Sequence, residues 1–147
     1  MLSEVEPMFS IEVSSKSDAA VAAALSRRYA RDHGLPARSS AEVAVVVSEL
    51  ATNLVRHAGG RGWIELWREP EWLCIRASDR GPGMADPSRL FSGREEGRPG
   101  PLPGESLGEG GAAVRRLSDS VQVANRDGGG LEVVARKRVV HEKRRQA

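Results

Sequence analysis

A carboxylate and a carboxamide lie four residues apart in the stretch EVAVVVSELATNLVRHA, residues 42–58. The three- and four-residue spacing of its apolar side chains predicts a helix with one buried stripe. Glu49 and Asn53 therefore project together, one turn apart. A carboxylate can accept a proton from a hydroxyl or water, and an amide oxygen can hold a hard cation. An isolated pair of this kind is more often a solvated part of an amphipathic helix.

Two glycine-containing stretches downstream strengthen the functional interpretation of that pair. The first, DRGPG at residues 79–83, follows a predicted strand. The second, GEGG at residues 108–111, precedes a predicted helix. A pair suited to metal, an acidic turn with two glycines and a glycine-rich helix entry, in this order, outline a nucleotide site.

Size and composition bound the class of protein. The chain has 147 residues and 15.8 kDa, which fits one domain with a real core. It has no apolar run long enough to span a bilayer and no apolar leader, so we expect a soluble cytoplasmic protein. The single cysteine, Cys74, lies in an apolar strand and is predicted to be a packed thiol.

The distribution of charge is uneven. The formal net charge is +2, but basic residues are concentrated at 136–138 and 143–145. These segments are either a nucleic-acid footprint or a solvated strand end followed by a basic tail. Trp63, Trp67 and Trp72, which could stack on bases, lie far away in the sequence, so we favour the second interpretation and do not expect a nucleic-acid partner.

Patterning predicts three helices and five strands. The alternation of apolar and polar residues indicates strands at residues 9–13, 62–69 and 72–78. It also indicates a final hairpin with its turn at 127–130. Ser17 or Asp18 is expected to cap a helix that runs to about His33 and stops at Gly34. The central helix is expected to begin at Ser39 or Ser40, because Ser39 and Glu42 have the spacing of a capping box. A third helix is predicted at 112–119.

This order of elements predicts an α+β fold, a two-layer sandwich of a mostly antiparallel sheet with helices on one face. We divide the chain into a leader, a folded domain and a basic tail, at residues 1–8, 9–138 and 139–147. Residues 82–106 are rich in Gly, Pro, Ser, Arg and Glu. A loop of that length in a compact domain is usually a functional lid or disordered, and we expect a lid that becomes protected when nucleotide binds.

Three short segments resemble the motifs of a known superfamily. ELATN at 49–53, DRGPG at 79–83 and LGEG at 107–110 resemble the N box and the two glycine boxes of the gyrase, histidine-kinase and MutL (GHKL) ATPases. The longer stretch SELATNLVRHAGG, with VRRL at 114–117, is most similar to RsbT-type serine-protein kinases, which are relatives of the anti-sigma-factor kinases. The resemblance extends over residues 9–138 and implies the histidine-kinase-like (Bergerat) ATPase fold.

The resemblance implies a role for each motif residue in binding ATP and Mg²⁺. Glu49 would be the general base toward a substrate serine, Asn53 a magnesium ligand, and Asp79 the acceptor for the adenine amino group. The glycines would let the backbone approach the base, at Gly81 and Gly83, and the phosphates, at Gly108, Gly110 and Gly111.

The resemblance also implies a function. It predicts an ATP- and magnesium-dependent serine kinase that phosphorylates a STAS-domain partner, an anti-anti-sigma factor or stressosome scaffold, in a bacterial partner-switching pathway. A metal-dependent phosphatase and a sigma factor are further partners of this class. The alternative is a nucleotide-binding adaptor of the anti-sigma type without turnover. Glu49 separates the two, because phosphoryl transfer needs it and nucleotide binding does not.

The chain departs from these relatives at three positions. Ser106 and Ala113 stand where these relatives usually have glycine, and Leu131 stands near the position at which they have a threonine that supports the adenine pocket. Leu131 offers no side-chain hydrogen bond, which predicts modest nucleotide affinity. Arg80, Arg94 and Arg98 are equal candidates for contact with a phosphate.

Overall fold

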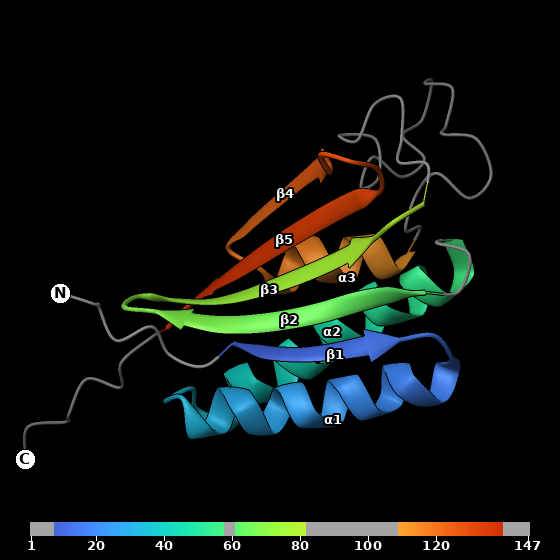
Figure 1. Ribbon diagram of the computed structural model, residues 1–147. Coiled ribbons are helices and arrows are strands. Elements are labelled where there is room, and N and C mark those ends of the chain that lie inside the picture. The colour runs from blue at the N-terminus through green and yellow to red at the C-terminus, as the bar shows by residue number, and fades with distance from the viewer. Residues whose placement is uncertain (1–7, 58–60, 82–108, 140–147) are drawn as a thin grey trace, which may run out of the picture.

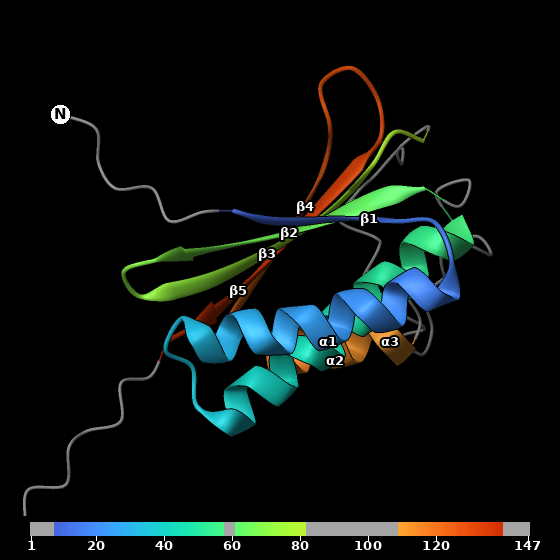
Figure 2. The same cartoon turned by 60° about the horizontal axis from the view of Figure 1, so that its bottom comes forward.

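The computed structural model describes residues 8–57, 61–81 and 109–139. Their strands form one antiparallel sheet in the order β1-β2-β3-β5-β4, and their helices all lie on one face of it (Figures 1 and 2). The predicted α+β two-layer fold is confirmed. The elements are β1 (Phe9–Val13), α1 (Lys16–Asp32), α2 (Ala37–His57), β2 (Gly62–Glu69), β3 (Trp72–Asp79), α3 (Glu109–Leu117), β4 (Ser120–Asn125) and β5 (Leu131–Arg138). No helix in the described part of the chain is long and apolar enough to cross a membrane.

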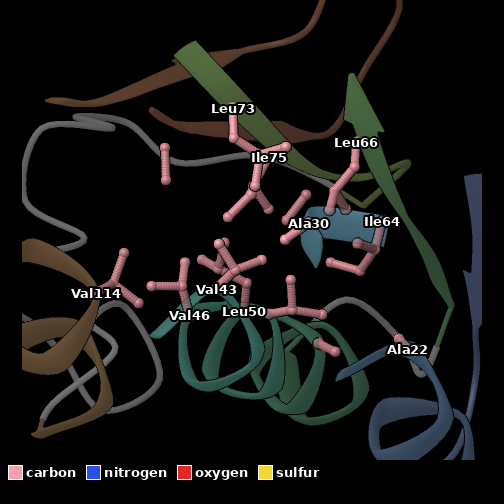
Figure 3. Packing of buried hydrophobic residues seen from close by; sticks show 14 of the residues in the cluster. Ala22, Ala30, Val43, Val46, Leu50, Ile64, Leu66, Leu73, Ile75 and Val114 are labelled. Atoms are coloured by element: carbon pink, nitrogen blue, oxygen red, sulfur yellow. The ribbon is translucent and has the colours of Figure 1, made fainter. Parts of the chain in front are cut away.

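The core lies between the sheet and α2 (Figure 3). Val43, Val46 and Leu50 of α2 are at most 1% exposed and point toward the apolar side chains of β2 and β3. The side chains that meet them alternate along the strands, as the period of a half-buried strand requires: Ile64, Leu66, Leu73 and Ile75. Ala22 and Ala30 of α1 and Val114 of α3 close the two sides of this layer.

The cap of α1 differs from the prediction. The N-cap is Ser15 rather than Ser17 or Asp18, and its hydroxyl accepts a hydrogen bond from the amide of Asp18 at 3.1 Å. The carboxylate of Asp18 in turn accepts from the amide and the hydroxyl of Ser14. These bonds hold the pKa of Asp18 below its usual value. The predicted stop is confirmed, because Gly34, which follows the C-cap residue His33, has φ +97°.

The start of α2 also differs from the prediction. The helix begins at Ala37, directly after Pro36, whose fixed φ suits a helix entry. Ser39 and Glu42 therefore lie inside the helix and do not form the expected capping box. The hydroxyl of Ser40 donates instead to the carbonyl of Leu35 at 3.2 Å.

The basic segment 136–138 is divided between the two faces of the sheet. The side chain of Lys137 is only 13% exposed, and its Nζ lies 3.1 Å from a carboxylate oxygen of Glu42. The same ammonium donates to the carbonyl of Leu117, the last residue of α3, at 2.7 Å. The interpretation of this segment as a uniformly solvated strand end is therefore wrong for Lys137, because the alternation of β5 turns it toward the helices.

Candidate functional site

The segments that carry the predicted motifs lie at one end of the molecule. The second half of α2, the end of β3 and the start of α3 all approach this end (Figures 1 and 2). Gly62 of β2 makes that approach possible. It stands opposite Asp79, and a Cβ on it would lie 2.7 Å from the side chain of Leu54. Glycine at this position thus lets α2 pack directly on the sheet, which brings Asn53, the neighbour of Leu54, to the site.

The side-chain oxygen of Asn53 has no hydrogen-bond partner among the described residues. This atom, Oδ1, is buried. A buried acceptor without a partner costs free energy, and native proteins retain few of them. Glu49, one turn earlier on α2, is half-buried. An amide oxygen to which no described residue donates fits the ligand set of Mg²⁺, which takes one or two protein oxygens along with phosphate and water.

Asp79 uses one carboxylate oxygen to organise the end of the sheet. Its side chain belongs to the helix face and the residue is 9% exposed. Oδ1 accepts from the amides of Gly81 at 2.7 Å and Leu131 at 3.2 Å. No described residue donates to Oδ2, and a carboxylate oxygen can accept from a donor such as an exocyclic amino group. Asp79 can therefore hold the turn and read a ligand at the same time.

Two backbone features of this site were not predicted from the sequence. A Cβ at Gly130, which has φ +99°, would lie 1.9 Å from the carbonyl oxygen of Asp79, so only glycine permits this contact. Leu131 then supports Asp79 through its main-chain amide, a contact that does not depend on its side chain. The run of three glycines before β5 was the available signal, but it was interpreted only as a turn. Arg126 adds a hydrogen bond to the carbonyl of Asp79 at 3.0 Å.

The remaining motif residues are only partly placed. Gly110 and Gly111 lie in the first turn of α3, which begins at Glu109 rather than at residue 112, and Gly111 is buried. The whole predicted lid, residues 82–106, lies outside the described residues, and with it Gly83, Arg94, Arg98 and Ser106. Gly108 lies outside them as well. The guanidinium of Arg80 lies 5.1 Å from the ring of Trp63, on the face of the sheet opposite to the helices.

Comparison with known proteins agrees with the fold. Residues 13–137 match the model of a family described as the histidine kinase-like ATPase domain. Among solved structures, the chain is similar to one in the crystal structure of the SiaB–SiaC complex from Pseudomonas aeruginosa. The TM-score is 0.62 at 14% sequence identity, over 87% of this chain and 88% of that chain. A search of curated proteins found no match.

Proposed function

The chain belongs to the histidine kinase-like ATPase domain family, and from that premise we propose that it is an ATP- and magnesium-dependent serine kinase of a regulatory protein. The observation that carries the proposal is the buried Oδ1 of Asn53, which accepts no hydrogen bond from a described residue and lies one helical turn from Glu49. A cation ligand and a proton acceptor at that spacing are what phosphoryl transfer to a hydroxyl needs.

Each residue then has one task in the transfer. Oδ2 of Asp79 accepts from the adenine amino group, and the amides at the start of α3 face the phosphates. The Glu49 carboxylate takes the proton of the substrate serine as that oxygen bonds to the γ-phosphorus. The bond between this phosphorus and the β–γ bridging oxygen breaks, and ADP leaves. Mg²⁺ held by Asn53 would neutralise charge on the phosphate oxygens.

We further propose that the substrate is a STAS-domain protein in a partner-switching pathway. The sequence similarity to RsbT-type kinases supports this partner class. The likeness to a chain of the SiaB–SiaC complex is consistent with a fold that works beside a protein partner.

The decisive experiment compares transfer with binding. Each variant is incubated with labelled ATP and a candidate STAS protein, and the same pair is tested by pull-down. Glu49→Gln should retain ATP and partner but slow labelling by about 10²- to 10⁴-fold, the usual contribution of a general base. Glu71→Gln, the same change in the exposed turn between β2 and β3, is the control and should label at the wild-type rate.

Two outcomes would contradict the proposal in different ways. Labelling of the partner by Glu49→Gln at the wild-type rate removes Glu49 as the base. A wild-type protein that binds ATP and partner but never labels it is an adaptor without turnover.

Nucleotide binding has its own test. Asp79→Asn keeps an oxygen acceptor for Gly81 and Leu131 but loses the charge, so ATP should bind more weakly by about 1.5–3 kcal/mol while the fold persists. GTP should bind more poorly than ATP, because it presents a carbonyl where adenine has an amino group. Equal ATP affinity of wild type and Asp79→Asn would remove Asp79 from the site.

Asn53→Ala should abolish the magnesium dependence of ATP binding in calorimetry, whereas Asn53→Asp should keep it.

A further inference from the structure

One stripe of side chains on α2 faces α3. Its members recur at steps of four and three residues, so they share one face of the helix: Glu42, Val46, Glu49 and Asn53. The two helices are in contact, and Val114 of α3 points toward Val46 (Figure 3). The polar members of the stripe are half-buried. Glu42 therefore faces the same helix as the two residues proposed for phosphoryl transfer.

Lys137 of β5 closes one end of this contact. Its Nζ lies 3.1 Å from a carboxylate oxygen of Glu42 and donates to the carbonyl of Leu117 at 2.7 Å, and its side chain is 13% exposed. Leu117 is the last residue of α3, so its carbonyl has no partner within the helix, and a cation there is favoured by the helix dipole. One ammonium group thus holds the end of α3 beside the beginning of α2.

The two helices run in opposite directions (Figure 1). Because the end of α3 is held beside Glu42, its beginning lies further along α2. The nine residues of α3 extend over about 12 Å at the helical rise. Glu49 and Asn53 lie about 10 and about 16 Å beyond Glu42 on the same basis. The first turn of α3, with Gly110 and Gly111, is therefore level with the part of α2 that carries Glu49 and Asn53.

Helix α3 is short and poor in apolar contacts. It has two glycines in its first turn, and helices of this length are marginal without tertiary packing. Val114 is buried and Leu117 packs partly against the core, whereas Ala112, Arg115 and Arg116 are exposed. Apolar contacts at the middle and end of the helix do not by themselves fix the position of its first turn. The ammonium of Lys137 adds a directional contact that does.

We propose that Lys137 is a positioning residue for the phosphate side of the site. By holding the end of α3 against Glu42, it sets the gap between the first turn of α3 and Asn53, where the triphosphate would bind. Lys137 itself does not reach the nucleotide, because its ammonium is engaged at the opposite end of α3. This inference rests on the proposed function, since it assigns the triphosphate to the gap between α2 and α3.

Recognition of adenine should not depend on Lys137. Asp79 accepts from the amide of Leu131 at the start of β5, whereas Lys137 lies near the end of that strand. A ligand without phosphates therefore separates the two halves of the site. Adenosine needs only the Asp79 side, and ATP needs both sides.

The test compares the affinities of the full chain for ATP, by calorimetry, and for adenosine, by NMR titration. Lys137→Met removes the ammonium but keeps an apolar stem. It should weaken ATP binding by about 10-fold, the loss of one charge-assisted hydrogen bond to a phosphate. Adenosine affinity should change by less than about 2-fold, because the two sites are distant. Lys137→Arg keeps a cationic donor and should lose less ATP affinity than Lys137→Met does.

The matched control is Arg138→Met, which removes the same charge at the next residue. Arg138 lies on the open face of the sheet, the face opposite to the helices (Figure 2), and its guanidinium lies 5.2 Å from the ring of Trp72. This variant should bind both ligands as wild type does. A loss of ATP affinity in Arg138→Met as large as that in Lys137→Met would overturn the inference, because net charge alone would then explain both.

The ratio of the two affinities separates positioning from stability. A variant that is only less folded binds ATP and adenosine more weakly by the same factor. Equal weakening of both ligands in Lys137→Met, or no weakening of either, overturns the inference and leaves the proposed function standing. A wild type that does not bind ATP refutes the proposed function and this inference with it.

A second variant covers the case in which Lys137→Met does not fold. Glu42→Gln keeps an oxygen for the ammonium of Lys137 but removes the charge, at a side chain that is 29% exposed. It should lower the ratio of ATP to adenosine affinity by about 3-fold, because a neutral acceptor forms a weaker hydrogen bond. An unchanged ratio in Glu42→Gln would then overturn the inference.

Discussion

The two faces of the sheet use the same strands for opposite purposes. Apolar side chains dominate the helix face of the sheet, and its charged groups contact other elements. Asp79 accepts a hydrogen bond from the amide of Leu131, and Lys137 forms an ion pair with Glu42. On the open face, charged groups pair with their neighbours in the sheet, as Glu65 does with Arg76. Substitutions on the helix face should therefore change folding and the proposed nucleotide site, and those on the open face should have smaller effects on stability.

The adjacent residues Lys137 and Arg138 illustrate the difference. Lys137 links β5 to α2 and to the last residue of α3, whereas Arg138 is exposed and stacks over Trp72. Because α3 begins at the glycines expected to face phosphates, Lys137 stabilises the helix on which that part of the site depends. A change of one position along a strand thus exchanges a role in the core for a role at the surface.

The largest expected difference between the faces is in the core. Val133→Ala removes two methyl groups from a side chain that is 4% exposed and should lower the free energy of unfolding by about 2–3 kcal/mol. Val134→Ala, the same change on the open face, should cost less than about 1 kcal/mol. Chemical denaturation of dilute protein measures both values, and equal losses would mean that the open face is packed as tightly as the core.

The ammonium group of Lys137, whose side chain is 13% exposed, should have the next largest effect on the free energy of unfolding. Lys137→Met leaves Glu42 and the carbonyl of Leu117 without their partner and should cost about 1–2 kcal/mol, a value reduced because Glu42 is 29% exposed. Arg138→Met, one residue further, should change stability by less than about 0.5 kcal/mol. Thermal unfolding of the two variants compares them directly. If Arg138→Met lowers stability as much as Lys137→Met does, the face of the sheet on which a residue of β5 lies has no effect on its contribution to stability.

The fold was largely predictable, because alternation and helical periodicity are local signals. The strand at residues 9–13 and both hairpins were predicted from them. The starts of the helices were less accessible. Ser39 and Glu42 have the spacing of a capping box, but α2 begins earlier, at Ala37, directly after Pro36. Glu42 forms an ion pair with Lys137 instead. That pairing depends on the register between β5 and the helices, which no local pattern encodes.

The site was predictable only as a set of motifs. Glu49 and Asn53 share a helix, so their spacing places them together without knowledge of the fold. The support that Asp79 receives from the amide of Leu131 was not predictable, because a backbone contact leaves no mark on residue type. The pairing of Trp72 with Arg138 was likewise missed. The two residues are distant in the sequence and meet only because β3 lies beside β5.

The pKa of the Cys74 thiol depends on how well the open face of the sheet excludes water. It lies on that face yet is fully buried, and burial raises the pKa of its thiol from 9.0 to about 11, with Glu69 adding to the effect. The unfolded chain therefore loses this proton at lower pH than the folded protein, so its contribution to stability is complete below pH 9.0 and is lost as the pH rises to about 11. Cys74→Ala should lack that part of the decline in denaturation midpoint. Identical pH profiles for both proteins would mean that the thiol is in contact with water.

The smallest expected effect concerns the pair of Glu65 and Arg76 at the centre of the open face. Glu65 holds the pKa of Arg76 above its usual value through a hydrogen bond of 2.8 Å, with side chains 20% and 30% exposed. Partial exposure and the entropy of two long side chains limit such a pair to about 0.2–1 kcal/mol. A double-mutant cycle with Glu65→Gln and Arg76→Met measures the coupling in dilute solution, and high salt should reduce it. The same cycle on Glu42 and Lys137 should give a larger coupling that responds less to salt, because those side chains lie between sheet and helices. If the two couplings are equal and equally screened, the distinction between the faces lies in shape rather than in electrostatics.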